Sequence, residues 1–188
     1  PCHNAAPWLG ATLESALADP QVAGILLDID SPGGEASGSF ELARRVREGA
    51  AVKPIWALAN DSAFSAAYAI AAAADRVIIS ETGGVGSIGV IALHIDQSIK
   101  DAHDGYRYTA VTAGSHKNDF SPHEPLSDTA KAELQAEVDR LYGLFVDHVA
   151  GMRRCTAEDV RMTEAGLFFG ANAVAAGLAD ALGSFESV

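Results

Sequence analysis

Residues 22–34 read VAGILLDIDSPGG, and this stretch decides the fold class. The run from Val22 to Ile29 is short and almost entirely apolar, which is typical of a strand buried on both faces of a parallel sheet. The turn formers Asp30-Ser31-Pro32-Gly33-Gly34 follow at once, so the strand ends there. A buried strand that runs into a glycine-rich turn predicts an α/β sheet, in which ligands bind beyond the carboxyl ends of the strands.

Strand-like and helix-like stretches alternate around this segment, as far as residue 125. The other expected strands cover residues 54–59, 76–80, 88–95 and 106–112. The expected helices cover residues 12–19, 39–49, 65–74 and 97–104. Strands that alternate with helices over short connections predict a mostly parallel α/β structure.

The pattern becomes helical after residue 125. Ser127 is a candidate N-cap of one long helix that extends to Arg153, because an apolar stripe follows it at helical spacing. A shorter helix is expected over residues 171–176, with Gly177 just beyond its end. The C-terminal part is therefore predicted to be mainly helical.

The composition indicates a folded protein with a real core. The 188 residues are 48% hydrophobic and 20% charged, which is typical of a globular domain. We expect a single domain over residues 1–188, with an α/β core over 12–125 and a mainly helical part over 126–188. No apolar run reaches the roughly 18 residues of a membrane-spanning helix. Because the chain begins with Pro1, we expect it to be a processed segment with flanking parts missing.

The charge and the cysteines exclude several classes of partner and compartment. Lys and Arg number 13 against 25 Asp and Glu, so the net charge is −12. This charge repels phosphate backbones and anionic lipids, so we expect no nucleic-acid partner and no membrane-surface partner. Cys2 and Cys155 lie far apart without a CxxC spacing, which predicts no disulfide framework and a reducing compartment.

A candidate nucleophile lies in residues 60–74, NDSAFSAAYAIAAAA. Here a strand leads into a bend, and Ser65 stands at the start of an alanine-rich helix. The free N–H groups and the positive dipole end of a helix N-terminus would stabilise an oxyanion formed at this serine. Two alternatives remain open: Ser65 is only a helix cap, or Ser62 takes the nucleophile's role.

The turn after the first buried strand offers backbone donors. Gly33 and Gly34 carry no side chain, so their N–H groups can face a ligand at close range. The N–H of Gly34, paired with that of Ala66, would complete an oxyanion hole. On its own, the SPGG stretch is only a turn signal.

Residues 84–89, GVGSIG, match the GxGxxG pattern of dinucleotide-binding sites. That pattern requires a helix to begin there, whereas an apolar strand-like run follows, so we expect no nucleotide cofactor. The prediction is instead a glycine-rich edge of the cleft, where a peptide substrate pairs in extended form. The predicted substrate-binding residues are Gly33, Gly84, Gly86, Ser87 and Ile88.

Histidines and carboxylates offer weaker alternatives. His116 or His94 would serve as a general base only with an orienting carboxylate, for which Asp119 or Asp96 is available. Asp28 and Asp30 share one face of a strand end, but two carboxylates do not make a metal site. The histidines and cysteines show no zinc-ligand spacing, so no metal is expected.

Five motifs in order resemble the S49 family of serine peptidases, which contains the signal peptide peptidases and the phage head proteases. They are LLDIDSPGG, AFSAAY with AAAADRVI, TGGVGSIGV, AGSHKNDFSP and GANAVAAGLAD. The stretches PIWALANDSA, AGSHKND and GLADAL are most similar to the capsid-assembly proteases of lambda-like phages, a branch of that family. The resemblance covers residues 12–183 and implies the ClpP/crotonase-like α/β spiral fold.

The resemblance also implies roles for particular residues. Ser65 matches the family's nucleophile, Lys117 its general base, and Gly34 and Ala66 its backbone oxyanion donors. The chain departs from the family at Ala66 and Ala67, where many members have glycines, so the space beside the nucleophile is narrower. A free lysine has a pKa of about 10.4 and works as a base only when burial disfavours its charge. Since family members form rings or domes, we expect subunit packing to supply that burial.

The function implied is a serine endopeptidase with a Ser–Lys dyad and no cofactor. Its expected substrates are phage scaffold or capsid proteins, cleaved during prohead maturation in the host bacterial cytoplasm, and its expected state is a homo-oligomer. One alternative is a bacterial signal-peptide peptidase fragment, membrane-associated through an anchor outside this segment. Others are a non-catalytic capsid assembly module of the same fold and a crotonase-type acyl-CoA lyase, which would not need Ser65 together with Lys117.

Overall fold

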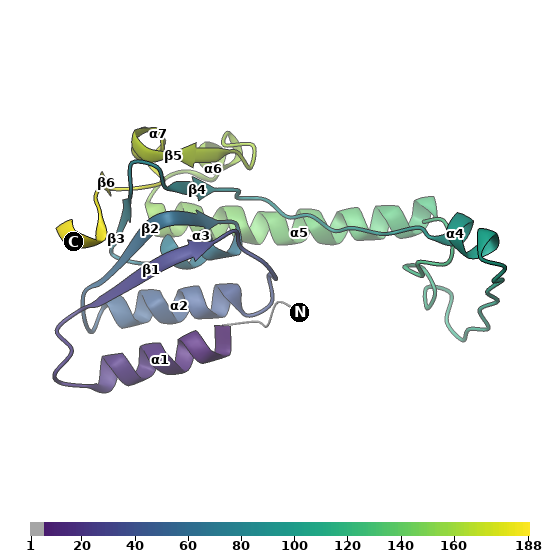
Figure 1. Ribbon diagram of the computed structural model, residues 1–188, viewed down its shortest axis with the longest axis horizontal. Coiled ribbons are helices and arrows are strands. Elements are labelled where there is room, and N and C mark those ends of the chain that lie inside the picture. The colour runs from purple at the N-terminus through teal and green to yellow at the C-terminus, as the bar shows by residue number, and fades with distance from the viewer. Residues whose placement is uncertain (1–5) are drawn as a thin grey trace. The chain divides into compact units, whose positions relative to one another are not determined.

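A computed structural model describes residues 6–188, and within them the chain forms two compact units (Figure 1). Of the described residues, the sheet unit comprises 6–89 and Leu144–Val188, and the middle unit comprises Val90–Gly143. The long helix α5 (Asp128–Arg153) belongs to both units, since it begins in the middle unit and ends in the sheet unit. The division therefore does not follow the predicted boundary near residue 125.

The sheet unit is built on a six-stranded, mostly parallel sheet with β2 at its centre. β2 pairs in parallel with β1 on one side, and on the other with β3 and then, further along, with β4. β3 pairs in parallel with β6, and β5 alone is antiparallel to its neighbour β4. This confirms the predicted sheet type. The strands are β1 (Ile25–Ser31), β2 (Ile55–Phe64), β3 (Arg76–Ile79), β4 (Gly84–Gly86), β5 (Leu167–Phe169) and β6 (Ala181–Leu182).

Helices complete the sheet unit, and Figure 1 shows two of them, α1 and α2, beside each other on one face of β1 and β2. α2 packs its apolar stripe of Leu42, Ala43 and Val46 inward, because these residues recur at helical spacing between charged ones. In α3, Tyr68 is fully buried and donates a hydrogen bond to the carbonyl of Leu178 (2.8 Å). The helices are α1 (Ala6–Ala18), α2 (Ser39–Ala50), α3 (Ala66–Ala71), α6 (Ala157–Arg161) and α7 (Gly170–Ala175), and a 3-10 turn (Phe185–Ser187) ends the chain.

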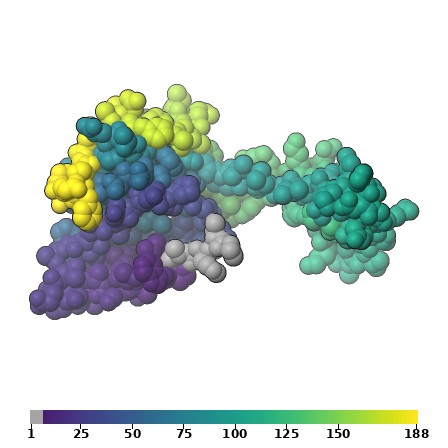
Figure 2. Space-filling view, in the orientation of Figure 1, coloured from purple at the N-terminus to yellow at the C-terminus, as the bar shows by residue number. Residues whose placement is uncertain are grey.

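The C-terminal residues are tied to the sheet by a charged cluster. Arg153, whose side chain is 8% exposed, donates two hydrogen bonds of 2.9 Å to the carboxylate of Asp180 and others to the carbonyl of Gly177. Asp180 also accepts from the N–H of Val77 in β3 (2.6 Å). Burial would raise the pKa of Asp180, but these hydrogen bonds hold it below its usual value. In Figure 2 the yellow C-terminal residues accordingly lie at one end of the sheet unit, beside its blue-green strands.

The middle unit contains little regular structure. Its elements are α4 (Ser98–His103) and the first part of α5, whose N-cap is Ser127 as predicted: the Ser127 hydroxyl accepts from the N–H of Ala130 (3.1 Å). His123 joins Asp101 through a 2.8 Å contact and stacks on Tyr108 at 3.6 Å. Within the described chain, no helix is long and apolar enough to cross a membrane.

Two strand predictions in this part of the chain are wrong. Residues 88–95 and 106–112 form no strand within the described structure, because no other segment pairs with their backbones. The apolar run that predicted a buried strand is solvent-exposed instead and joins no sheet of the described chain. The exposed fractions are 78% for Ile91, 81% for Leu93 and 72% for Ile95. Strand propensity is expressed only where packing and ladder partners exist.

Candidate active site

Ser65 stands between the end of β2 and the start of α3, as the sequence predicted. Its backbone has φ 51° and ψ −124°, a conformation that costs a non-glycine residue on the order of 1–3 kcal/mol. Two backbone hydrogen bonds hold it there: its N–H donates to the carbonyl of Gly86 (2.9 Å), and its carbonyl accepts from the N–H of Ala69 (3.1 Å). A sharp, strained strand-to-helix turn of this kind is how hydrolases expose a nucleophilic serine.

The SPGG turn approaches Ser65 closely. A Cβ added to Gly33 would lie 2.6 Å from the Cβ of Ser65 and 3.1 Å from the backbone nitrogen of Ala66, so only glycine fits at this position. Gly33 itself has φ 98°, and its N–H donates to the hydroxyl of Ser31 (3.2 Å). The structure thus brings the predicted glycine turn against the predicted nucleophile.

Two backbone donors beside Ser65 are available. Within residues 6–188, neither the N–H of Gly34 nor the N–H of Ala66 has an acceptor. Ala66 is the first residue of α3, so its N–H is one of those that a helix leaves unpaired. Both residues line the same cavity, which is where an oxyanion would require its donors.

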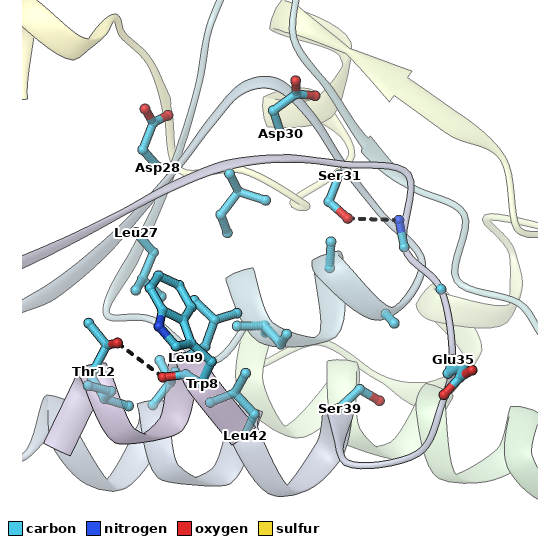
Figure 3. Close-up of a pocket in the computed structure, with 18 of the residues that line it drawn as sticks. Trp8, Leu9, Thr12, Leu27, Asp28, Asp30, Ser31, Glu35, Ser39 and Leu42 are labelled. Atoms are coloured by element: carbon cyan, nitrogen blue, oxygen red, sulfur yellow. Dashed lines mark hydrogen bonds between the residues drawn. The ribbon is translucent and has the colours of Figure 1, made fainter. Parts of the chain in front are cut away.

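That cavity has a volume of about 650 Å³ and lies within the sheet unit (Figure 3). Gly33, Gly34 and Ala66 line its end beside Ser65, and apolar side chains of α1, α2 and α3 line much of the remainder. The latter include Trp8, Leu9, Leu13, Leu42, Val46 and Ile70. The volume is in the range of ordinary ligand pockets, and the lining favours an apolar group.

The sequence predicted none of the α1 residues in this cavity. The expected helix began at residue 12, whereas α1 begins at Ala6 and carries Trp8 into the lining. Trp8 is 69% exposed, and a large aromatic side chain near the start of a helix is the one sequence signal that could have pointed to it.

The cavity's lining also includes Asp28 and Asp30 of β1, but their carboxylates point away from its apolar side. Figure 3 shows Asp28 and Asp30 on the opposite side of β1 from Trp8 and Leu9. Asp30 accepts a hydrogen bond from the hydroxyl of Ser62 (2.8 Å), so this carboxylate is paired beside the turn. Ser62 lies inside β2 rather than at a helix start, so the competing serine lacks the features of a nucleophile.

The predicted glycine-rich edge is not an edge at Gly84 and Gly86. β4 is hydrogen-bonded to β2 on one side and to β5 on the other, so a peptide cannot add to it there. The edge was predicted because no sequence pattern revealed β5, the strand that covers it. The three residues of β5 are too few for a periodic signal. Ser87 follows with φ 54° and donates its N–H to the carbonyl of Gly166 (2.9 Å), and Ile88 is fully buried.

Lys117 lies in the middle unit, in an irregular turn segment. Its N–H donates to the carbonyl of Gly114 (3.3 Å), and its side chain is exposed and forms no ion pair with residues 6–188. Since Ser65 belongs to the sheet unit, the pairing of the two side chains stays a prediction.

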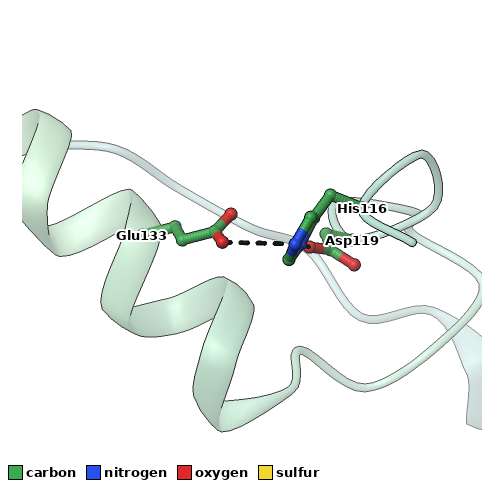
Figure 4. Close-up of side chains that lie close together, drawn as sticks. All are labelled: His116, Asp119 and Glu133. Carbon is green, nitrogen blue, oxygen red and sulfur yellow. Dashed lines mark hydrogen bonds and ion pairs between the residues drawn. The ribbon is translucent and has the colours of Figure 1, made fainter. Parts of the chain in front are cut away.

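The histidine alternatives also fall in the middle unit. His116 contacts Asp119 as the alternative required, with 2.7 Å between Nδ1 and the carboxylate, and it lies 3.4 Å from Glu133 (Figure 4). The hydrogen bond with Asp119 and the charge of Glu133 raise the pKa of His116. His94 contacts the carbonyl of Ser121 (2.9 Å) rather than Asp96.

Cys155 shows no activation. Burial and the charge of Asp159 raise the pKa of its thiol, whereas a nucleophilic cysteine needs a lowered one. Cys2 lies outside the described residues.

The profile of peptidase family S49 matches residues 47–188. The match includes Ser65, Ala66 and Lys117, and it begins after the SPGG turn. It covers well over half of the chain.

Two phage proteins are similar over almost the whole chain. The head-tail preconnector protein GP5 of Enterobacteria phage P21 is 40% identical over 172 residues, and the capsid assembly protease C of Escherichia phage lambda is 38% identical over 172 residues. Each alignment covers 92% of this chain but only 34% and 39% of the respective relative. The chain thus spans little more than a third of the length of these proteins.

A solved structure shares the fold. A mutant of the membrane-bound stomatin-specific protease 1510-N superposes with a TM-score of 0.62 at 12% identity, over 94% of this chain and 73% of that one. The likeness confirms the expected ClpP/crotonase-like α/β fold.

Proposed function

This chain belongs to peptidase family S49, and we propose that it is a serine endopeptidase in which Ser65 is the nucleophile and Lys117 the general base. The observation that carries the proposal is the strained backbone of Ser65 at the β2–α3 junction, pressed against Gly33. A strained serine at a helix start, next to unpaired backbone N–H groups, suits acyl transfer and has no evident structural purpose.

The proposed chemistry proceeds through an acyl-enzyme. The neutral amine of Lys117 takes the hydroxyl proton of Ser65 as the serine oxygen bonds to the scissile carbonyl carbon. The N–H groups of Gly34 and Ala66 stabilise the resulting oxyanion. Lys117 then returns the proton to the leaving amine as the peptide C–N bond breaks. Water repeats the attack on the ester, with Lys117 again as base, and Ser65 is released.

The base requires a desolvated environment that the middle unit by itself does not supply. A lysine ammonium in water holds its proton at neutral pH, and the side chain of Lys117 is exposed. The middle unit that carries it also exposes large apolar side chains, among them Ile91, Leu93, Ile99 and Val111. We therefore propose a homo-oligomer in which a second copy covers this unit and desolvates the amine.

The cavity beside Ser65 suggests how a polypeptide substrate is held. Its apolar lining from α1 and α2 suits an apolar side chain next to the scissile bond, with the carbonyl directed at Gly34 and Ala66. Binding energy from such a side chain would orient the carbonyl for attack. Since β4 is paired on both sides, the substrate backbone is not expected to pair with Gly84 or Gly86.

The biological role proposed is processing of phage scaffold or capsid proteins during prohead maturation, in the host bacterial cytoplasm. It is supported by the similarity to a capsid assembly protease at 38% identity. The alternative is a signal-peptide peptidase fragment of the same family, whose anchor lies outside this chain. A non-catalytic assembly module or an acyl-CoA lyase is less well supported, because neither needs a strained serine at position 65.

Paired substitutions test the dyad. Ser65→Ala and Lys117→Ala are each expected to lower casein cleavage and self-processing by about a thousand-fold or more. The matched controls are Ser62→Ala, which removes the neighbouring hydroxyl, and Lys131→Ala, which removes an exposed lysine of the middle unit. Both controls should cleave like the wild type. Unchanged cleavage by either dyad variant, with circular dichroism and assembly intact, would rule out the mechanism.

The oligomer is tested by dilution. The cleavage rate per chain is expected to fall when the protein is diluted below the concentration at which light scattering shows dissociation. A constant rate per chain across that transition would show that the monomer desolvates its own base, and the proposed role of the second copy would be abandoned.

A further inference from the structure

Three metal-ligating side chains meet in the middle unit, away from the proposed nucleophile (Figure 4). His116 and Asp119 belong to the turn that carries Lys117, and Glu133 projects toward them from α5. One donor atom from each of the three lies within 4.8 Å of the other two. The sequence did not reveal this group. Glu133 lies on α5, too far along the chain from His116 and Asp119 to form a recognisable ligand-spacing motif with them.

Two of the spacings in this group are close to those of ligands around one ion. Metal–nitrogen and metal–oxygen bonds of about 2.0–2.2 Å place neighbouring ligand atoms roughly 2.8–3.5 Å apart in octahedral or tetrahedral geometry. The Nδ1 atom of His116 is 2.7 Å from Asp119 and 3.4 Å from Glu133. Asp119 and Glu133 supply one donor atom each within 4.8 Å of one another, so the three side chains can turn toward one ion.

The local charge favours a cation. Within residues 6–188, neither Asp119 nor Glu133 forms an ion pair with a lysine or arginine. Among these described residues, the imidazole of His116 is the one basic group that contacts these two negative carboxylates. Acidic residues of the middle unit outnumber basic ones by nine to five. In contrast, Glu137, another exposed carboxylate on α5, is paired with Arg140.

We propose that His116, Asp119 and Glu133 bind one divalent transition-metal ion of the Zn²⁺ type. One imidazole nitrogen with two carboxylate oxygens is a mixed donor set that suits Zn²⁺ better than Mg²⁺ or Ca²⁺, which prefer oxygen alone. The ion joins the turn at residues 116–119 to α5, and so restrains the segment that presents Lys117. The proposed peptide cleavage has no step on this ion, and its binding is measured independently of activity.

Calorimetric titration of the untagged, chelator-treated chain with ZnCl₂ tests the site. One equivalent is expected to bind to the wild type. Asp119→Asn and Glu133→Gln should each weaken binding roughly ten- to hundred-fold, and His116→Ala should weaken it at least as much. Glu137→Gln is the matched control, because it removes a carboxylate from the same helix outside the group. It should bind Zn²⁺ like the wild type.

Hydrogen exchange supplies a second readout. Added Zn²⁺ is expected to slow amide exchange over residues 114–121 in the wild type and in Glu137→Gln, but not in Glu133→Gln. The assignment is overturned if the wild type binds no Zn²⁺, if the three ligand variants bind it unchanged, or if Ca²⁺ binds as tightly. Circular dichroism checks that the exposed substitutions leave the fold intact.

Discussion

The two units of this chain use apolar residues in opposite ways. In the sheet unit, residues such as Leu58, Ile79 and Tyr68 are fully buried between the sheet and its helices. In the middle unit, Leu93 and Ile99 are more than four-fifths exposed, and regular structure is limited to α4 and the start of α5. The sheet unit has a core of its own, whereas the middle unit has apolar surface without one.

This difference indicates where stability and adaptability lie. Local stability follows the density of buried apolar contacts, so the sheet unit should open only with global unfolding and the middle unit more readily. The strained Ser65 needs the rigid sheet unit to hold its backbone, because strain persists only where the surroundings enforce it. Lys117, the proposed base, lies in the middle unit, whose packing can change more easily when a partner binds.

A truncation in each unit should show the largest contrast. Leu58→Ala is expected to lower the free energy of unfolding by about 2–5 kcal/mol, because it leaves a cavity in a fully buried position. Leu93→Ala, at an 81% exposed position, should change it by less than about 0.5 kcal/mol in the dissociated chain. Urea unfolding followed by circular dichroism measures both. Equal losses would mean that the middle unit has a core after all.

Two arginines give the next contrast. Arg153→Ala should cost about 2–3 kcal/mol, because the half-buried carboxylate of Asp180 loses its cationic partner and the carbonyl of Gly177 loses its donors. Arg140→Ala removes an exposed pair with Glu137 in the middle unit and should leave the midpoint of unfolding almost unchanged, because water and salt screen such pairs. The midpoints of urea unfolding report the difference, and similar midpoints for the two variants would contradict it.

The cap of α5 sharpens the comparison within one helix. Ser127→Ala should destabilise the first turns of α5 by about 1 kcal/mol, since the Ser127 hydroxyl accepts from the N–H of Ala130. Faster amide exchange is expected over residues 128–132 and not over residues 145–152, which pack in the sheet unit. Uniformly faster exchange along α5 would show that its two parts open together.

The smallest effect concerns pH. Burial lowers the pKa of His148, which contacts the carbonyl of Ala69 (2.8 Å) near Arg44 and Arg47. The imidazole of His148 therefore binds a proton more tightly in the unfolded chain than in the folded one. Its neutral form favours the folded chain above about pH 6.5, and this contribution to the free energy of unfolding is lost as the pH falls through the lowered pKa.

His148→Gln replaces the ring N–H that faces the carbonyl of Ala69 with an amide N–H, and it removes the titration. Its melting temperature should fall less between pH 7 and pH 5 than that of the wild type. His103→Gln, at a side chain that is 89% exposed, is the control and should follow the wild-type pH dependence. Parallel curves for the wild type and His148→Gln would remove His148 as the cause.

Much of the sheet unit could be predicted because its signals are local. The apolar run before Asp30, the glycines of the SPGG turn and the serine ahead of an alanine-rich helix each specify a backbone conformation over a few residues. The strands and helices found there agree with those predictions to within a few residues at most ends, and the cap at Ser127 agrees as well.

Only the tertiary structure decided what depends on distant neighbours. The run at residues 88–95 is as apolar as a buried strand but stays unpaired, and Gly84 and Gly86 are enclosed by a strand from near the C-terminus. The cavity lined by Trp8 and the meeting of His116 with Glu133 likewise join segments that no local pattern connects. Periodicity and turn chemistry act over a few residues, whereas strand partners, cavities and ligand groups arise from contacts between segments far apart in the chain.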